Sequence, residues 1–408
     1  MNKDNLDQPI SADFEIISRV DEPKNKPNLK TILKHLGLFL TTFITVSVIG
    51  TVFVGFGGEI IFLGPLALPG SDDLMRGALF ATLLLSFLTF HEFGHYFAAV
   101  YHRISVTLPY YIPLPLGIGT LGAVIRIKEK IHETKKLFDI GIAGPLAGFI
   151  VSLIVLIIGF STLPDPSFVQ NFSGHEELKA YVSEHGTYPT EQLTTEDGST
   201  LIVGNTLLFT FISSFFENVP PMWEMYHFPF LFAGWLGLFF TALNLMPVGQ
   251  LDGGHILYSL LGYKKHRDVA RVFFTFISIL AGIEAVPLIH ELLGPYDTSF
   301  GALSWIIWGA MLSSLMTIAF NKNRHWVSLM APTSLISSGI YIYQIAGSSN
   351  LEPSYIWLVW LVFITFMVKV DHPPVTFYKP VSTGRKVLGW LSMLIFVLCI
   401  SLNPLSMQ

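Results

Sequence analysis

The chain has 408 residues, of which 51% are hydrophobic and only 13% are charged, and its mean hydropathy is +0.56. Soluble domains carry about 25% charged residues, so this composition predicts a polytopic membrane protein. The net charge of -5 provides no basic surface for nucleic acid, and a single cysteine, Cys399, excludes a disulfide framework and a thiolate metal site. Any metal ion must be held by His and carboxylate groups.

The amino-terminal region predicts a polar tail followed by a first membrane crossing. Residues 1–29 are polar and lack the basic start and apolar core of a signal peptide. The missing transit peptide favours a bacterial plasma membrane over an organellar one. Residues 30–73 should contain a crossing from Thr31 to Phe56, since about 20 helical residues span a bilayer, and then an outer loop.

The second apolar segment, Leu74 to Tyr101, contains the sequence His-Glu-Phe-Gly-His at positions 91–95. On a helix, a spacing of four places His91 and His95 on one face, so both imidazoles can hold one metal ion while Glu92 stays free beside it. The alternative is a chance match to a short motif. Burying these three groups in a membrane costs several kcal/mol unless they have partners, which favours the metal site.

Residues 104–136 contain too many prolines and glycines for a regular helix, although their first half is apolar. Irregular backbone is tolerated at membrane depth only against protein or a water-filled cavity, so this segment should line the cavity of the metal motif. The alternation over Ala123 to Lys128 predicts a strand. Its edge could hold an unwound peptide by strand addition, with Gly119, Gly122 and Ile125 as tentative substrate contacts; a purely structural hairpin is the alternative.

The third crossing is expected from Leu137 to Phe160, and its Gly144 and Gly148 should allow close helix packing. Residues 161–227 follow as an acidic external loop, in which His175 and His185 are not expected to be ligands. The apolar run Leu201 to Phe216 within this loop predicts a helix at the membrane surface.

The fourth crossing, Phe228 to Leu261, contains Pro247 and several glycines that should break the helix partway. This break would expose Asp252 at membrane depth, where a carboxylate needs a partner. A metal ion held by two imidazoles would provide that partner, because a catalytic zinc takes three protein ligands and leaves its fourth position open.

The carboxyl-terminal part, residues 263–408, contains five more apolar segments, near 269–290, 301–320, 326–346, 354–370 and 387–404. Loops rich in Lys and Arg alternate with acidic loops. This pattern predicts nine crossings, with the amino terminus in the cytoplasm and the 161–227 loop outside. The catalytic membrane core would then be residues 74–262.

The two motifs together resemble those of the site-2 protease family of intramembrane zinc metalloproteases. The second motif is Asn-x-x-Pro-x-x-x-Leu-Asp-Gly-Gly at positions 244–254, and residues 117–148 are also similar to the family's hairpin and third core helix. The resemblance is greatest to the group without a PDZ domain, which includes plant chloroplast members. It implies that His91, His95 and Asp252 bind Zn2+ and that Glu92 activates water.

Three other features follow from the resemblance or lie close to the motifs. The family's Asn, thought to contact substrate, matches Asn244. Residues Asp371 to Pro374 are also similar to a motif of the same group, but a simple turn after a membrane segment is the favoured interpretation. His255 could donate to a metal ligand or be a packed core histidine, and the second reading is favoured.

The sequence therefore predicts an all-α polytopic membrane protein of about nine transmembrane helices, with a small membrane-associated β-hairpin near the active site. The resemblance implies regulated intramembrane proteolysis: hydrolysis of peptide bonds in or near transmembrane helices of membrane-anchored proteins. Expected partners are single-pass transmembrane substrates, an upstream protease that acts first, and membrane lipid, but no nucleic acid.

Three alternatives remain open from the residues. An ion- or proton-coupled transporter would use Glu92, Asp252 and Glu284 as ion sites and should contain an internal repeat, which is not found. A different membrane zinc protease would take a downstream Glu as its third ligand. A metal-free scaffold is opposed by the intact set of four residues.

Overall fold

The computed structural model describes residues 28–57, 60–63, 66–191, 201–296, 301–345 and 355–407. The predicted polar tail lies outside these residues except for its last two positions. The described part is mostly helical, with three two-stranded sheets. Five of its helices are long and apolar enough to cross a membrane: α1 (Leu29–Val54), α2 (Ser71–Tyr101), α3 (Thr134–Ser161), α8 (Tyr263–Leu293) and α9 (Ala302–Ala319). The chain is a membrane protein.

The other predicted crossings also contain helices, but these are shorter than 18 residues. They are α6 (Pro229–Asn244) with α7 (Asp252–Leu261), α10 (Arg324–Ile340), α11 (Ile356–Phe363) and α12 (Thr383–Cys399). Helices α10 and α11 each continue into a π-helical turn, over residues 341–345 and 364–368. All nine predicted apolar segments are therefore helical, while the count of nine crossings stays a prediction.

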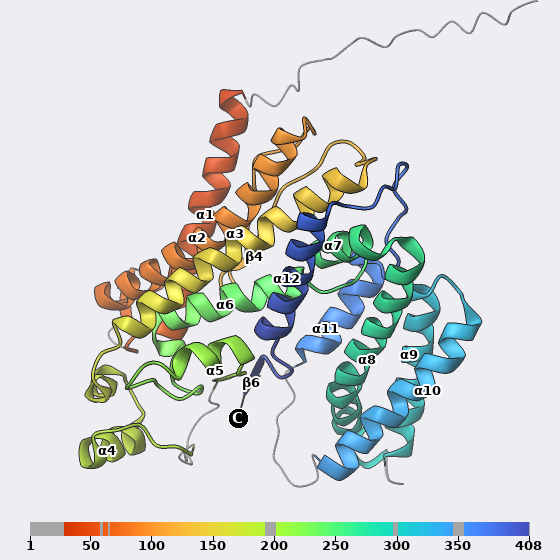
Figure 1. Ribbon diagram of the computed structural model, residues 1–408. Helices are drawn as coiled ribbons and strands as arrows, with labels where there is room; N and C mark the ends of the chain where they lie inside the picture. The colour runs from red at the N-terminus through yellow and green to blue at the C-terminus, as the bar shows by residue number, and fades with distance from the viewer. Residues whose placement is uncertain are drawn as a thin grey trace, which may run out of the picture.

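The helices form two groups (Figure 1). Helix α1 packs on α2, α2 on α3, and both α2 and α3 on α6, while α8 to α11 pack on one another. Helix α12 lies against α3, α6 and α7, and α7, which packs on both α3 and α8, joins the two groups. Helix α6 is apolar on every side and buried over most of its length, including Trp235, which is what a central helix requires.

The predicted β-hairpin is present, with β3 (Tyr110–Pro113) antiparallel to β4 (Thr120–Val124). β4 begins earlier in the chain than the predicted strand, Ala123 to Lys128. Residues 125–128 run beside residues 105–107, but an isolated bridge and single hydrogen bonds connect them there instead of a continuous ladder. The hairpin is attached to two helices. Thr45 on α1 donates to the Gly119 carbonyl at 2.8 Å, and the hydroxyls of Thr89 on α2 and Tyr111 are 2.7 Å apart.

The region between α3 and α6 is more structured than a solvated loop. It contains the short 3-10 turn η1 (Pro166–Asn171), α4 (Glu176–His185), β5 (Leu201–Val203), α5 (Leu207–Ser213) and the 3-10 turn η2 (Met225–His227). The predicted surface helix over Leu201 to Phe216 is wrong in its first part, because β5 pairs there with β6 (Leu405–Met407). A second hairpin, which was not predicted, connects α1 to α2 and consists of β1 (Ile60–Leu63) and β2 (Leu66–Pro69).

Candidate active site

The three predicted metal ligands come together in the structure. His91 and His95 lie on one face of α2, both buried, with their Nε2 atoms 3.2 Å apart. Asp252 is the first residue of α7, and its Oδ2 lies 3.2 Å from Nε2 of His95 and 3.6 Å from Nε2 of His91. Donors at about 2.0–2.1 Å from a tetrahedral ion are about 3.3 Å from one another, so these separations fit a zinc site.

The surroundings of the two imidazoles orient them toward Asp252. Nδ1 of His95 lies 2.7 Å from the Ile140 carbonyl of α3, so this nitrogen donates and Nε2 is left as the ligand atom. Nδ1 of His91 is buried and makes no hydrogen bond to a described residue. Both rings therefore present Nε2 to the same point, and the Ile140 carbonyl was not foreseen from the sequence.

Gly144 and Gly148 of α3 provide the space that these rings occupy. A Cβ at Gly144 would overlap the His95 imidazole, and a Cβ at Gly148 would lie 3.2 Å from Nδ1 of His91 and 2.7 Å from the Phe87 ring. The two glycines were predicted to allow helix packing, which they do. They also form the wall of the metal site, because the imidazoles fill the space that side chains would take.

Glu92 lies beside this set and is held by the hairpin segment. Its Oε1 is 4.0 Å from Nε2 of His91, and its Oε2 accepts a hydrogen bond of 2.8 Å from the backbone N–H of Ile125. The Arg126 carbonyl and the Lys128 N–H point toward residues 105–107. Since backbone groups alternate along an extended chain, the Ile125 N–H belongs to the opposite, outer edge. That edge faces Glu92.

Asp252 reaches the site because the fourth segment is broken, as predicted. Helix α6 ends at Asn244 and α7 begins at Asp252, and the connection is so tight that a Cβ at Gly253 or Gly254 would overlap the carbonyls of Leu245 and Gly249. The glycines of the second motif therefore let the chain turn and deliver the carboxylate. Asn244, at the end of α6, is partly exposed and makes no side-chain hydrogen bond with the described residues.

Residues 79–283 match the family model described as peptidase family M50, which spans both motifs. The chain belongs to this family. It is the family of site-2 proteases that the motifs resemble. No solved structure matches the chain.

Several curated proteins are similar to this M50 chain over the same region. It is 31% identical over 181 residues to a probable zinc metalloprotease EGY1, chloroplastic, of Oryza sativa subsp. japonica, which covers 44% of this chain and 27% of that protein. The Arabidopsis thaliana EGY1 is 30% identical over 44% of this chain and 29% of its own length, and Arabidopsis EGY2 is 30% identical over 47% and 30%. The chain thus spans less than a third of each of these relatives.

The tentative substrate contacts of the M50 chain lie at three different places. Gly119 has φ +88 and packs so close to the α1 backbone at Val46 that a Cβ would not fit, which gives it a structural role. Gly122 has φ +96 and open space around it, and Ile125 contributes its N–H to Glu92. The structure therefore brings Ile125 to the site and places Gly119 against α1.

The segment from Asp371 to Pro374 is more than a turn. Asp371 forms two hydrogen bonds with Arg271 of α8, at 3.1 and 2.7 Å. Nε2 of His372 lies 2.8 Å from Nδ1 of His255, one turn after Asp252 on α7, and burial lowers the pKa of His372 to about 4. This segment therefore attaches the end of the α11 region to the helix that carries Asp252. His255 contacts His372 rather than a metal ligand.

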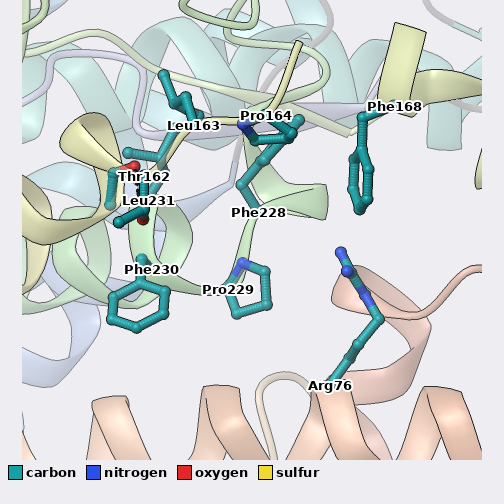
Figure 2. A pocket seen from close by; sticks show the side chains of 10 residues that line it. Arg76, Thr162, Leu163, Pro164, Phe168, Phe228, Pro229, Phe230 and Leu231 are labelled. Atoms are coloured by element: carbon teal, nitrogen blue, oxygen red, sulfur yellow. Dashed lines mark hydrogen bonds between the residues drawn. The ribbon is translucent and has the colours of Figure 1, made fainter. Parts of the chain in front are cut away.

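A separate pocket of about 280 Å³ opens at the carboxyl end of α3 and the amino end of α6 (Figure 2). Arg76 and Phe168 line one side of it, and Phe228 to Leu231 line the other. None of the predicted site residues contributes to this pocket. The reactive groups of the M50 chain instead lie where the hairpin meets α2.

Proposed function

We propose that this M50 chain is an intramembrane zinc metalloprotease that hydrolyses peptide bonds in or near the transmembrane helices of membrane-anchored proteins. The observation that carries the proposal is the convergence of His91, His95 and Asp252 at donor separations of 3.2–3.6 Å, with Glu92 beside them. Two imidazoles, one carboxylate and a free glutamate are the set used by zinc hydrolases.

The four site residues have different roles in the proposed hydrolysis. His91, His95 and Asp252 hold the ion, and zinc, when bound, supplies a Lewis acid that lowers the pKa of water and polarises a peptide carbonyl. Glu92 takes the proton of the attacking water and later delivers it to the leaving amine. Because Oε2 of Glu92 is engaged by the Ile125 N–H, Oε1 is the oxygen that exchanges the proton.

The substrate is expected to bind as an added strand. A helical amide is hydrogen-bonded and shielded, so a transmembrane helix must unwind before it can be cleaved. Among the described residues β4 pairs only with β3, and its other edge continues to Ile125 beside Glu92, which supports docking of an extended peptide there. Single-pass membrane proteins, trimmed beforehand by another protease, are the proposed substrates within regulated intramembrane proteolysis.

The topology proposed for the chain has nine crossings, with the amino terminus in the cytoplasm and residues 161–227 outside. The placement is supported by the excess of Lys and Arg in the alternate loops near residues 264–271, 322–324 and 379–386. We place the protein in a bacterial plasma membrane. Fractionation of the native cells tests this location directly, since the similar relatives carry chloroplastic names.

A transporter is the main competing function, and the surroundings of Glu284 favour the protease. This carboxylate is buried and accepts hydrogen bonds from the N–H groups of Leu358 at 2.8 Å and Trp357 at 3.3 Å. It therefore stabilises the start of α11, as a helix N-terminus favours an anion. The Glu284 side chain is enclosed between α8 and α11.

The decisive experiment separates the base from the ligands. Glu92→Gln should keep its zinc and bind substrate but cleave it 10²–10⁴-fold more slowly, about the contribution of a general base. Asp252→Ala should lose the zinc ion of this site, because two imidazoles do not retain it against a chelator. Zinc per protein in detergent is measured beside cleavage of a transmembrane substrate. Full zinc and activity in Asp252→Ala would exclude the proposed site.

A further inference from the structure

A second group of metal-binding side chains lies in the region between α3 and α6. His175 precedes α4, Glu224 precedes η2, and His227 is the last residue of η2, immediately before α6. One donor atom from each of the three lies within 4.8 Å of the others. The sequence does not indicate this group. Glu224 and His227 lie 49 or more residues after His175, and the region that contains all three has the composition of a solvated loop.

Burial makes these side chains unusual. Glu224 and His227 are only 4% and 8% exposed, and Oε2 of Glu224 makes no hydrogen bond with a described residue. The His227 ring makes no side-chain hydrogen bond and has the Phe53 backbone beside it. A buried carboxylate oxygen without a donor costs free energy, so this arrangement calls for a cation between the three groups.

We propose that His175, Glu224 and His227 bind a second divalent cation, for which zinc is the best match. Nδ1 of His175 lies 3.3 Å from Oε1 of Glu224, and Nε2 of His227 lies 3.8 Å from Oε2. The carboxylate thus presents a different oxygen to each imidazole and would hold the ion through both oxygens. Donor separations of about 3.3 Å are needed in a zinc site, which the first pair meets and the second exceeds by about 0.5 Å. A donor set of two imidazoles and one carboxylate favours the binding of zinc over that of Mg2+ or Ca2+.

The charges around the group are compatible with this assignment. Burial, with a smaller contribution from His175, lowers the pKa of His227 to about 3, which keeps its ring in the neutral form that binds metal. The hydrogen bond that His175 donates to Glu224 raises the pKa of His175, so the ion must displace one proton there. Arg76 is a nearby cation, but it donates to the His227 carbonyl rather than to Glu224.

The ion would fasten the outer region to the membrane core. His175 belongs to the η1–α4 part, whereas His227 leads directly into α6, and the Phe172 ring stacks on His227 at 4.5 Å and limits water access. Helix α6 has 16 residues, so about 24 Å of helix separates this group from the Asn244 end near the catalytic set. The two ions can therefore be removed independently.

Metal analysis of the full chain, purified in detergent and exposed to zinc before removal of the excess, tests the proposal. Wild type should hold two zinc ions per chain, Glu224→Gln one, and Asp252→Ala one. His185→Ala, which removes an exposed histidine of α4, is the matched control and should keep two. One ion in wild type, lost entirely in Asp252→Ala, would overturn the proposal.

A second measurement does not depend on the folding of Glu224→Gln. The Asp252→Ala protein loaded with Co2+ should show the visible absorption of a tetrahedral cobalt site, with one equivalent bound at saturation. A protease added to this protein should cut residues 161–227 more slowly with the ion than with a chelator. An Asp252→Ala protein that binds no Co2+ would also contradict the second site.

Discussion

The two carboxylate oxygens of Glu92 have different neighbours, and this asymmetry matters for catalysis. Oε2 is fixed by the Ile125 N–H, while Oε1 lies toward His91. A base held by a backbone group of the hairpin segment is kept at one distance from the reacting water. Position, rather than acidity alone, should therefore limit the rate.

Glu92→Asp tests the importance of this position. The shorter side chain cannot reach both the Ile125 N–H and the ion, so cleavage should fall by about 10²-fold with zinc retained. Glu129→Asp is the matched control, because Glu129 also accepts a backbone hydrogen bond, from Ser105, but lies away from the metal ligands. Steady-state cleavage and zinc content are measured for both. Equal rates for the two variants would show that the Ile125 contact has no catalytic role.

At the scale of secondary-structure elements, the hairpin and the segment after α11 hold the catalytic helices from two sides. The hairpin could be predicted because the alternation of apolar and polar residues is a local sequence pattern. The histidine ligands could be predicted because their spacing of four on a helix is also a local pattern. The roles of Gly144, Ile140 and Asp371 could not be predicted, since each depends on which helix lies opposite. The β5–β6 pairing joins residues about 200 positions apart, and local patterns carry no information about such pairs.

Strand addition at β4 predicts a specific cross-linking pattern. Leu121 and Val124 are 66% and 48% exposed, and the one native cysteine, Cys399, is buried. In a Glu92→Gln background, cysteines at these two positions should form disulfides with a substrate whose cysteine is moved along the cleaved segment. Bands should appear at every second substrate position, as an extended strand requires. A cysteine at Phe97, exposed on α2, is the control. Bands of equal strength at all three positions would contradict docking on β4.

The attachment after α11 makes a second prediction at this scale. Arg271 is 3% exposed and its charge is balanced by Asp371, so Asp371→Ala leaves a buried cation without its partner and should cost about 3–5 kcal/mol of unfolding free energy. Asp268→Ala breaks the more exposed pair with Arg267, which should cost no more than about 1 kcal/mol. Thermal unfolding in detergent measures both. A smaller loss in Asp371→Ala than in Asp268→Ala would mean that the segment does not support the core.

At the scale of the whole molecule, the chain forms two helix groups (Figure 1), and the three metal-ligand candidates lie on α2 of the first group and on α7, which packs on both α3 and α8. The second group is connected to α7 by two contacts: Arg271 of α8 binds Asp371, and the neighbouring His372 lies against His255 of α7. Composition and apolar segment length predicted the membrane class and a helix in each of the nine apolar segments, but not α4 in the predicted loop. They could not give the number of crossings, because α6, α10, α11 and α12 are shorter than 18 residues.

Labelling in intact cells tests the orientation of the two groups. Glu184 on α4 and Lys265 on α8 are both exposed in the structure, and they lie on opposite sides of the membrane in the nine-crossing topology. A cysteine at Glu184 should react with an impermeant thiol reagent in intact cells, and a cysteine at Lys265 should react only after lysis. Wild type, with buried Cys399, gives the background. Reaction of both cysteines in intact cells would rule out this topology.

The glycine-lined face of α3 also restricts how this protein can evolve. At Gly144 the His95 imidazole occupies the space of a side chain, at Gly148 the Phe87 ring does, and at Gly141 a Cβ would lie 3.0 Å from the Cβ of His255. Even alanine, the smallest substitution, must therefore displace a neighbouring group. We expect that no single substitution of these glycines is tolerated. Saturation libraries at Gly144 should yield glycine alone among active clones, whereas Gly37, with open space around it, should accept many residues.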